Sequence, residues 1–448
     1  MHPFASYVLR SYYKSTGWNE DNLYSNFTRS SSSILDFTVP RGLHFSISKS
    51  PNALFKTTYS MNALPSLNGS IGYIFTSCDL NVKGSGDVKF KDIVDRFKIY
   101  DQPQRPEGKE EAWQAGERVD TRDYLLYGRF YIPTGRLDAL YSTRLSATLQ
   151  GMVAAISDPR APPVAASNLM LSLQHDTGRT CTEYTWSADD SMWGIRFLYN
   201  FGKLVLPPDH STEVYPTEVE LSSAVPQASQ SEVKRVDEEE AMEGGLKGRI
   251  SAGAEVYFSA REKSAGVSTG IRFTTLPDAT APSFQLPGPS SSPLALSSSR
   301  TPPQPPTTIT ALFNPIIGHI SGAYAAKVSH DLSVCSRFDF NVYSYESEWT
   351  MGAEWWLRRK PQPQNGDDTK TESDSIQADE SPSVPLETWT EDVQGVVKAR
   401  ASTTTDISLM WEGRLRNMLV SLGIVSNLSS RSKPIKAVGL ELAYFSSG

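Results

Sequence analysis

The amino-acid sequence predicts an all-β protein, a transmembrane β-barrel with a short N-terminal helix and long disordered loops. The main observation is a series of windows, each about ten residues long, in which apolar and polar side chains alternate. A second is the end of the chain, where residues 440–445 alternate in the same way. A strand at a chain end leaves an unpaired edge, which closure into a barrel removes. Barrel closure also satisfies every backbone donor and acceptor in a bilayer.

Aromatic residues gather near the ends of these windows, as the interfacial girdles of a membrane barrel require. A soluble sandwich also alternates, so alternation alone does not decide between the two. The tryptophans that favour the barrel are Trp193, Trp349, Trp355, Trp356, Trp389 and Trp411.

Composition agrees with a barrel and excludes other classes. Only 39% of the 448 residues are hydrophobic, and no window approaches the ~20 apolar residues of a transmembrane helix. A barrel gives the same weak hydropathy signal, because only alternate residues face lipid. The net charge of −7 argues against nucleic acid as a partner, since phosphate binding needs clustered Lys and Arg.

The N-terminal region predicts a helix over residues 4–18, because Phe4, Val8 and Tyr12 fall on one stripe and Gly17 is a suitable stop. We expect this helix to pack on or inside the fold, with anchoring to the membrane surface as the alternative. The first ten residues match neither a secretory signal peptide nor a cleaved matrix presequence. A barrel of this kind fits an organelle outer membrane reached from the cytosol.

Strand patterns dominate residues 33–446, in about 18–20 windows. We therefore expect residues 1–448 to form a single β-barrel domain. The clearest windows are 145–153, 168–173, 249–258, 267–273, 338–342, 348–357 and 418–424.

Four polar, low-complexity stretches interrupt the strands, and none can bury enough apolar surface to order itself. The alternation resumes after each, so they are predicted to be disordered loops and not domain boundaries. They are residues 101–120, 206–246, 277–307 and 361–392.

No motif in the chain supports an enzyme, a cofactor or a metal site. Gly266–Gly270 matches a nucleophile elbow, but alternation runs straight through it, so Ser268 is expected to be an inward-facing strand residue. Glu354 and Glu412 lie among aromatics and are expected to face a polar lumen. The six histidines lack metal spacing. The three cysteines, Cys78, Cys181 and Cys335, are expected to be buried or lipid-facing thiols without a chemical role.

Several stretches together resemble one family, the fungal mitochondrial distribution and morphology protein ten family, the outer-membrane barrel of the ER–mitochondria encounter structure. They extend over nearly the whole chain outside the low-complexity loops. The stretches are Val8–Trp18, Leu35–Pro40, Asn68–Phe75, Leu126–Pro133, Asn314–Ser321, Phe338–Ser347, Leu409–Arg414 and the terminal residues 436–448.

The resemblance implies a barrel of the mitochondrial porin type with nineteen strands, whose first and last strands pair in parallel. It implies a scaffold at ER–mitochondria contact sites that supports phospholipid exchange, mitochondrial morphology and mitochondrial DNA inheritance. The implied partners are SMP-domain lipid-transfer proteins, the ER membrane anchor of the encounter structure and the lipid bilayer. A second pool is implied to act with the sorting and assembly machinery in outer-membrane β-barrel and translocase receptor biogenesis.

The resemblance also assigns candidate site residues. Tyr73 and Phe75 match the tether-binding position, with Phe in place of an aromatic usually written Tyr. Phe338 and Phe340 match the assembly-machinery position. The alternative for both pairs is plain contact with lipid acyl chains. The terminal strand is similar to the sorting signal of mitochondrial β-barrels, through Lys436, Gly439, Leu442 and Tyr444, although Lys436 stands three residues before the glycine.

Two other functions remain open at this point. One is a solute channel of the porin type in the mitochondrial outer membrane, and the other is a soluble all-β binding protein. The long low-complexity loops favour a scaffold, because a housekeeping pore has short, compact loops.

Overall fold

The computed structural model describes most of the chain outside the low-complexity stretches. The predicted loops 206–246 and 361–392 lie outside the described residues, as do most of 101–120 and 277–307, so their disorder stays a prediction. The described residues are 3–80, 82–99, 113–114, 117–118, 123–160, 167–202, 248–275, 305–358, 393–404, 406–427 and 434–447.

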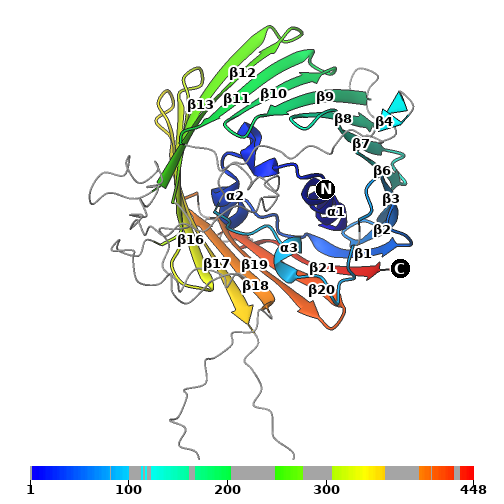
Figure 1. Ribbon diagram of the computed structural model, residues 1–448. Coiled ribbons are helices and arrows are strands. Elements are labelled where there is room, and N and C mark those ends of the chain that lie inside the picture. Colours follow the sequence, from blue (N-terminus) through cyan, green and yellow to red (C-terminus); the bar gives the residue numbers. More distant parts are fainter. Residues whose placement is uncertain are drawn as a thin grey trace, which may run out of the picture.

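A single sheet of nineteen strands forms the wall of a closed barrel, and the predicted fold class is confirmed (Figure 1). Two further short strands, β4 (Trp113–Gln114) and β5 (Glu117–Arg118), pair only with each other. The strands of the wall are β1 Gly42–Ser50, β2 Phe55–Leu64, β3 Asn68–Thr76, β6 Tyr124–Ile132, β7 Leu137–Arg144, β8 Leu149–Ser157, β9 Ser167–Asp176, β10 Thr180–Ser187, β11 Met192–Asn200, β12 Gly248–Ser259, β13 Ser264–Thr275, β14 Thr307–Asn314, β15 His319–Lys327, β16 Leu332–Asn341, β17 Ser347–Arg358, β18 Val393–Ser402, β19 Asp406–Leu415, β20 Met418–Asn427 and β21 Ile435–Ser447.

Each strand of the wall pairs antiparallel with the next along the chain, except at the seam. There β1 and β21 run parallel, with Gly42 opposite Gly439 and Ile47 opposite Tyr444. An odd number of strands that alternate in direction requires one parallel pair, so the count and the seam support each other. The parallel first and last strands are as predicted.

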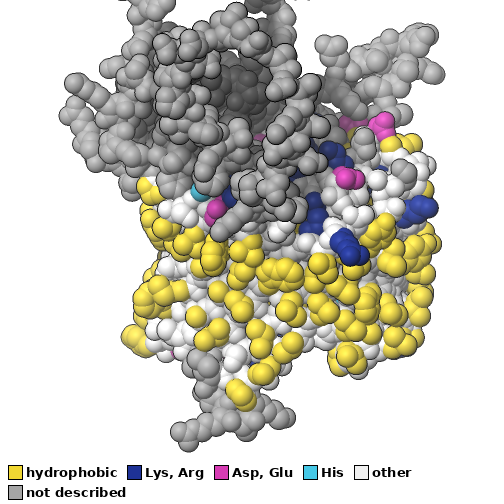
Figure 2. All heavy atoms as spheres, turned by 90° about the horizontal axis from the view of Figure 1, so that it is seen from below, with side chains coloured by type: hydrophobic (Ala, Val, Ile, Leu, Met, Phe, Trp, Pro, Cys, Tyr) yellow, Lys and Arg dark blue, Asp and Glu magenta, His cyan; other side chains and the backbone are white. Residues whose placement is uncertain are grey.

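Alternation along the strands separates a lipid-facing surface from a lumen. In β13, Ile271 is 58% exposed on the outside, whereas the next residue, Arg272, is 2% exposed and points inward. Figure 2 shows the result on one face of the wall, which is covered by hydrophobic side chains, with Lys, Arg, Asp and Glu gathered toward one rim. The outer surface is therefore suited to hydrocarbon and the inner surface to polar contacts.

Five short helical segments precede or interrupt the strands in the described part of the chain. They are α1 Pro3–Thr16, the 3₁₀ turns η1 Glu20–Asn22 and η2 Tyr24–Asn26, α2 Arg29–Leu35 and α3 Phe90–Ile93. Among the described residues, no helix is both long and apolar enough to cross a membrane.

The structure corrects three details of the sequence reading. Strands begin at Gly42 and not near residue 33, because residues 29–35 form α2. The window 145–153 is not one strand, since residues 145–148 turn between β7 and β8. Trp356, expected in an interfacial girdle, is 8% exposed and points into the lumen. Trp389 lies outside the described residues.

The two rims of the barrel differ in the connections they carry. The C-terminus lies at one rim, called the C-terminal rim, and the alternating strand directions place the ends of β3, β11, β13 and β17 there too. The four predicted low-complexity stretches follow these four strands, so the chain leaves the wall toward all of them at the C-terminal rim. The opposite rim carries short turns, such as residues 188–191 and 260–263.

Candidate functional site: a plugged lumen and two aromatic faces

Two stretches of chain, residues 3–41 and residues 77–99, occupy the lumen and are together called the plug. Figure 1 shows α1, α2 and α3 inside the ring of strands. All three buried apolar clusters of the described residues consist of plug side chains packed on inward-facing wall side chains. The hydrophobic core of this barrel therefore lies between the plug and the wall.

Helix α1 uses its predicted apolar stripe to pack inside the barrel. Phe4 and Val8 are fully buried and Tyr12 is 1% exposed. The Phe4 ring lies 4.9 Å from the ring of Phe445, which points inward from β21. The first and last segments of the chain are thus in direct contact, and the expectation that this helix packs within the fold is confirmed.

Helix α2 depends on the wall, because seven residues are too few for a stable isolated helix. Its C-terminal carbonyls accept hydrogen bonds from two inward-facing cations. The Nζ atom of Lys398 donates to the carbonyl of Ser33 at 2.9 Å, and the Nη1 atom of Arg400 donates to the carbonyl of Leu35 at 2.9 Å. Positive charge at a helix C-terminus is favourable, so these contacts stabilise α2 where it lies.

Glu354 and Lys398 form a buried charge pair beneath the plug. Their side chains are 1% and 2% exposed, and Glu354 Oε2 lies 3.9 Å from Lys398 Nζ. Glu354 also accepts hydrogen bonds from Trp356 Nε1 at 2.6 Å and from the backbone N–H of Phe97 at 3.2 Å. The lumen-facing carboxylate predicted from sequence is therefore a structural link between wall and plug. Glu412 also faces the lumen, lining the same cavity as Lys398.

The second plug stretch is held in the same manner. Arg414, on β19, donates from Nη1 to the carbonyl of Gly86 at 2.9 Å. The carbonyl of Phe445 accepts the backbone N–H of Ser85 at 2.9 Å. Wall strands near the seam therefore bind the plug through its backbone.

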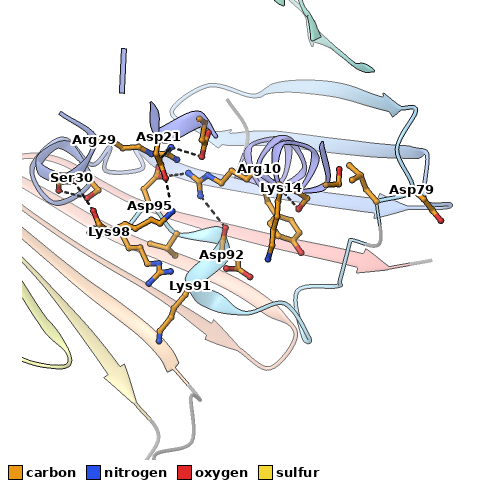
Figure 3. A pocket seen from close by; sticks show the side chains of 18 residues that line it. Arg10, Lys14, Asp21, Arg29, Ser30, Asp79, Lys91, Asp92, Asp95 and Lys98 are labelled. Atoms are coloured by element: carbon orange, nitrogen blue, oxygen red, sulfur yellow. Dashed lines mark hydrogen bonds and ion pairs between the residues drawn. The ribbon is translucent and has the colours of Figure 1, made fainter. Parts of the chain in front are cut away.

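Cavities of about 580, 570 and 330 Å³ lie between the plug and the wall in the described part of the lumen. Figure 3 shows the first, between α1, α2 and α3, lined by side chains of both signs. Most of these charges are paired: Arg29 Nη1 lies 3.0 Å from Asp21 Oδ1, Lys98 Nζ lies 2.9 Å from Asp21 Oδ2, and Arg10 pairs with Asp95. The lumen is thus divided into polar pockets by a plug bound to the wall.

Tyr73 and Phe75 point outward from β3, close to the C-terminal rim, and are 49% and 41% exposed. They lie within a row of outward aromatic rings, called the aromatic ladder. Phe55 stacks on Tyr73 with ring centroids 5.9 Å apart, Phe75 stacks on Tyr124 at 6.2 Å, and Tyr124 lies 6.4 Å from Tyr141. The ladder spans β2, β3, β6 and β7, and it presents rigid apolar rings at one edge of the membrane surface.

Phe338 and Phe340 also point outward, from β16, but they lie near the opposite rim. Phe338 is 51% exposed and stands across from Trp349 on β17, while Phe340 stands across from Ile320 on β15. The Trp349 Nε1 atom donates to Ser336 Oγ at 2.7 Å. These side chains form a second outward face, called the β16 face.

The two faces are well separated. On the shorter way around the barrel, β2, β1, β21, β20, β19, β18 and β17 lie between β3 and β16. The aromatic ladder lies near the C-terminal rim and the β16 face near the other rim. The two sites therefore share no surface.

The four residues predicted to form a sorting signal all lie on β21, the strand that closes the barrel. Lys436 Nζ lies 3.1 Å from Asp406 Oδ2 at the opposite rim. Gly439 points inward, whereas Leu442 and Tyr444 point outward and pair with Phe45 and Ile47 of β1. The predicted signal thus combines a small inward residue at the seam with two lipid-facing side chains.

The structure also places the serine and the cysteines that the sequence singled out. Ser268 lies in β13, and its Oγ atom lies 3.2 Å from the Tyr24 hydroxyl in the lumen. Cys181 and Cys335 are buried and Cys78 is half-buried, and none of the three is in a disulfide bond within the described residues. Among the described residues, no group of three or more His, Cys, Asp or Glu side chains could hold a metal ion.

These features define a class: a β-barrel with a lipid-facing outer surface, an odd number of strands, a parallel seam and a plugged lumen. The family described as Mitochondrial distribution and morphology protein 10 matches residues 1–390 and 386–447 of the chain. The chain belongs to this family.

Three relatives with that name show how close the similarity is. The protein of Postia placenta is 72% identical, and that of Laccaria bicolor is 67% identical, each over 100% of both chains. The protein of Cryptococcus neoformans is 39% identical over 99% of both chains. The resemblance noticed in the sequence is thereby confirmed.

Sequence reasoning missed several members of these sites. Phe55, Tyr124 and Tyr141 join the aromatic ladder because their strands are neighbours in the sheet, and alternation within one strand does not reveal cross-strand partners. Arg400 and Lys398 were also missed as anchors of α2. Their inward positions follow from the alternation of β18, but the plug that they hold was not expected beyond residue 18.

Proposed function

We propose that the chain is a membrane-anchoring scaffold, the outer-membrane subunit of the ER–mitochondria tethering complex. In this role it supports phospholipid exchange, mitochondrial morphology and mitochondrial DNA inheritance. It also acts with the sorting and assembly machinery in outer-membrane β-barrel and translocase receptor biogenesis. The observation that carries a scaffold over a channel is the plug, whose backbone is bound to the wall by Lys398, Arg400 and Arg414.

We assign the aromatic ladder, with Tyr73 and Phe75 at its centre, to the tether. Its partners are SMP-domain lipid-transfer proteins and the ER membrane anchor of the encounter structure. Aromatic side chains bury large area at low entropic cost and dominate interface energetics. Rings already stacked on Phe55 and Tyr124 lose little further freedom when a partner covers them, which supports this assignment.

We assign the β16 face, with Phe338 and Phe340, to subunits of the sorting and assembly machinery. A hollow of about 390 Å³ lies beside it, lined almost entirely by apolar groups that include Met351, Ala353 and Ala399. Small side chains between large ones give a surface into which a partner side chain can insert. This hollow surface supports contact with a protein partner over contact with lipid acyl chains alone.

The separation of the two faces bears on the two pools of the protein. Because the ladder and the β16 face share no surface, one partner does not mask the other by direct overlap. Each association can therefore be removed alone.

Affinity purification from mild-detergent mitochondrial membranes tests both assignments. Tyr73→Ala with Phe75→Ala should lose the tether proteins and keep the assembly machinery, and Phe338→Ala with Phe340→Ala should do the reverse. Tyr59→Ala is a matched control, since Tyr59 is 47% exposed on the outside of β2. If both associations survive in each double variant, the site assignments are wrong, and the scaffold role then depends on other surfaces.

The alternative function is a porin-type solute channel of the mitochondrial outer membrane. The lumen cavities support this alternative, because they leave space inside the barrel for a solute. Single-channel recording on the purified protein separates the two functions. A stable, large, voltage-gated conductance would favour the channel, and small or absent conductance would favour the scaffold.

A further inference from the structure

Four cationic side chains lie together on the lumen side of the C-terminal rim, away from both outward faces. Lys327 ends β15 and Arg358 ends β17, each pointing inward, while Lys91 and Arg96 belong to the second plug stretch. The charges of Lys91, Arg96 and Arg358 all act on the Lys327 ammonium group as like charges. These four residues are called the rim cluster.

The fold brings the rim cluster together from three separate parts of the chain. The turn of residues 328–331 joins β15 to β16, and the backbone N–H of Trp356 donates to the carbonyl of Asp331 at 2.8 Å, which sets the end of β17 beside this turn. The Trp356 ring also meets Phe90 of α3 edge-on, with centroids 6.2 Å apart. Lys91 follows Phe90 directly, so this contact holds the plug cations over the strand ends.

The cluster carries more positive than negative charge. Asp331 is the carboxylate that acts on Lys327, and it is already paired with Arg358. Arg96 interacts with the buried Glu354, which is already paired with Lys398. Among the described residues, neither Lys327 nor Arg96 forms an ion pair or a side-chain hydrogen bond. The cations of the adjoining cavity differ from these two in being paired: Arg10, Arg29 and Lys98 each form an ion pair with an Asp side chain.

Like charges held this close repel, and the repulsion is relieved when an anion lies between them. All four side chains are half-buried, so they are partly desolvated yet reachable from water at the rim. The Arg96 guanidinium offers forked donors that match phosphate oxygens, and the two ammonium groups add point charges. Arg358, already bonded to Asp331 and His330, adds its positive charge. A group with several anionic oxygens fits such a set of donors better than a single carboxylate.

We propose that the rim cluster is a binding site for a phosphate group, contributed either by a lipid headgroup at the membrane edge or by a soluble phosphate compound. The site lies inside the barrel mouth and does not involve the aromatic ladder or the β16 face. It is therefore independent of the partner assignments made above.

The test uses the full-length protein in a neutral detergent and measures dissociation constants by titration calorimetry. The probes are inorganic phosphate and dioctanoyl phosphatidic acid, with dioctanoyl phosphatidylcholine as the zwitterionic comparison. Arg96→Gln with Lys327→Gln should weaken probe binding by about tenfold or more, since each removes a charge-assisted contact. Lys263→Gln, an exposed lysine at the opposite rim, should leave the binding unchanged.

Removing repelling cations should not unfold the barrel, and an unchanged unfolding midpoint checks this. If the double variant does not fold, Lys91→Gln alone is measured in its place. Binding of both probes, lost in the variant, supports the site with either source of phosphate. Binding of the lipid probe alone points to a headgroup, and binding of inorganic phosphate alone points to a soluble anion. If neither probe binds, or if the variant binds both as tightly as the native protein, the proposal is overturned.

Discussion

Gly439 lies directly opposite Gly42 in the parallel pair that closes the barrel, and neither position has room for a Cβ atom. At Gly439 the added atom would lie 2.2 Å from the carbonyl oxygen of Pro40, in the part of the plug that joins α2 to β1. At Gly42, where φ is +75°, it would lie 2.2 Å from the carbonyl oxygen of Leu64. Gly439, the glycine of the predicted sorting signal, is thus also the place where the plug segment around Pro40 crosses the seam.

We predict that Gly439→Ala destabilises the closed barrel even without any sorting machinery. The clash is with backbone atoms, which move less easily than a side chain, and overpacking of this kind costs about 1–3 kcal/mol. Purified, denatured protein is refolded, and the folded fraction is measured by its heat-modifiable migration in gel electrophoresis. The unfolding midpoint of the refolded protein is then determined. Gly128→Ala is the control, because nothing lies within 4 Å of its added Cβ. Equal midpoints for the two variants would contradict the prediction.

The buried pair of Lys398 and Glu354 should control how firmly the plug is held. We predict that Lys398→Met loosens α2, since it removes the donor to Ser33 and leaves Glu354 without its cation, at a cost of about 3–5 kcal/mol. Hydrogen exchange of residues 29–35 should rise well before that of the wall strands. Adding Glu354→Gln should recover part of the loss, because no buried charge is then left alone. A double variant no more stable than the single one would argue against the pair.

If the aromatic ladder binds the tether, its outer members should contribute as well as Tyr73 and Phe75. Phe55→Ala or Tyr124→Ala should weaken recovery of the tether proteins several-fold, because each removes the ring on which Tyr73 or Phe75 stacks. Phe55 and Tyr124 lie on separate strands, so similar effects from both would indicate one continuous surface. Tyr59→Ala again serves as the control. An effect confined to Tyr73 and Phe75 would restrict the site to β3.

Tyrosines of α1 should make the plug sensitive to high pH. Burial raises the pKa of Tyr13 from 10.0 to about 12 and also raises the pKa of Tyr7. The unfolded chain then loses these protons first, so the stabilisation is complete below pH 10 and is lost as the pH rises toward 12. The unfolding midpoint should fall over this interval, and it should fall less in Tyr13→Phe. The same decline in both proteins would show that Tyr13 does not contribute.

The outer surface of the barrel was readable from the sequence, whereas the contents of the lumen were not. Alternation such as Gly270, Ile271 and Arg272 reports directly which side of a strand faces lipid. Helix α2 escaped notice because four serines in a row carry no apolar stripe, and the helix exists through contacts with Lys398 and Arg400 on a distant strand. The prediction of one strand over 145–153 was wrong because residues 145–148 turn between β7 and β8. Leu145 and Ala147 continue the apolar pattern through this turn. The ladder and the rim cluster likewise depend on which strands become neighbours.

The contact between Phe4 and Phe445 joins the two ends of the polypeptide inside a closed wall. The terminus that is synthesised first must therefore be in place, or still able to slip in, when the final strand takes its position between β20 and β1. Closure of the barrel by β21 therefore also encloses the N-terminal helix in the lumen. A chain that lacks β21 would lose the seam and, with it, the surface on which α1 rests.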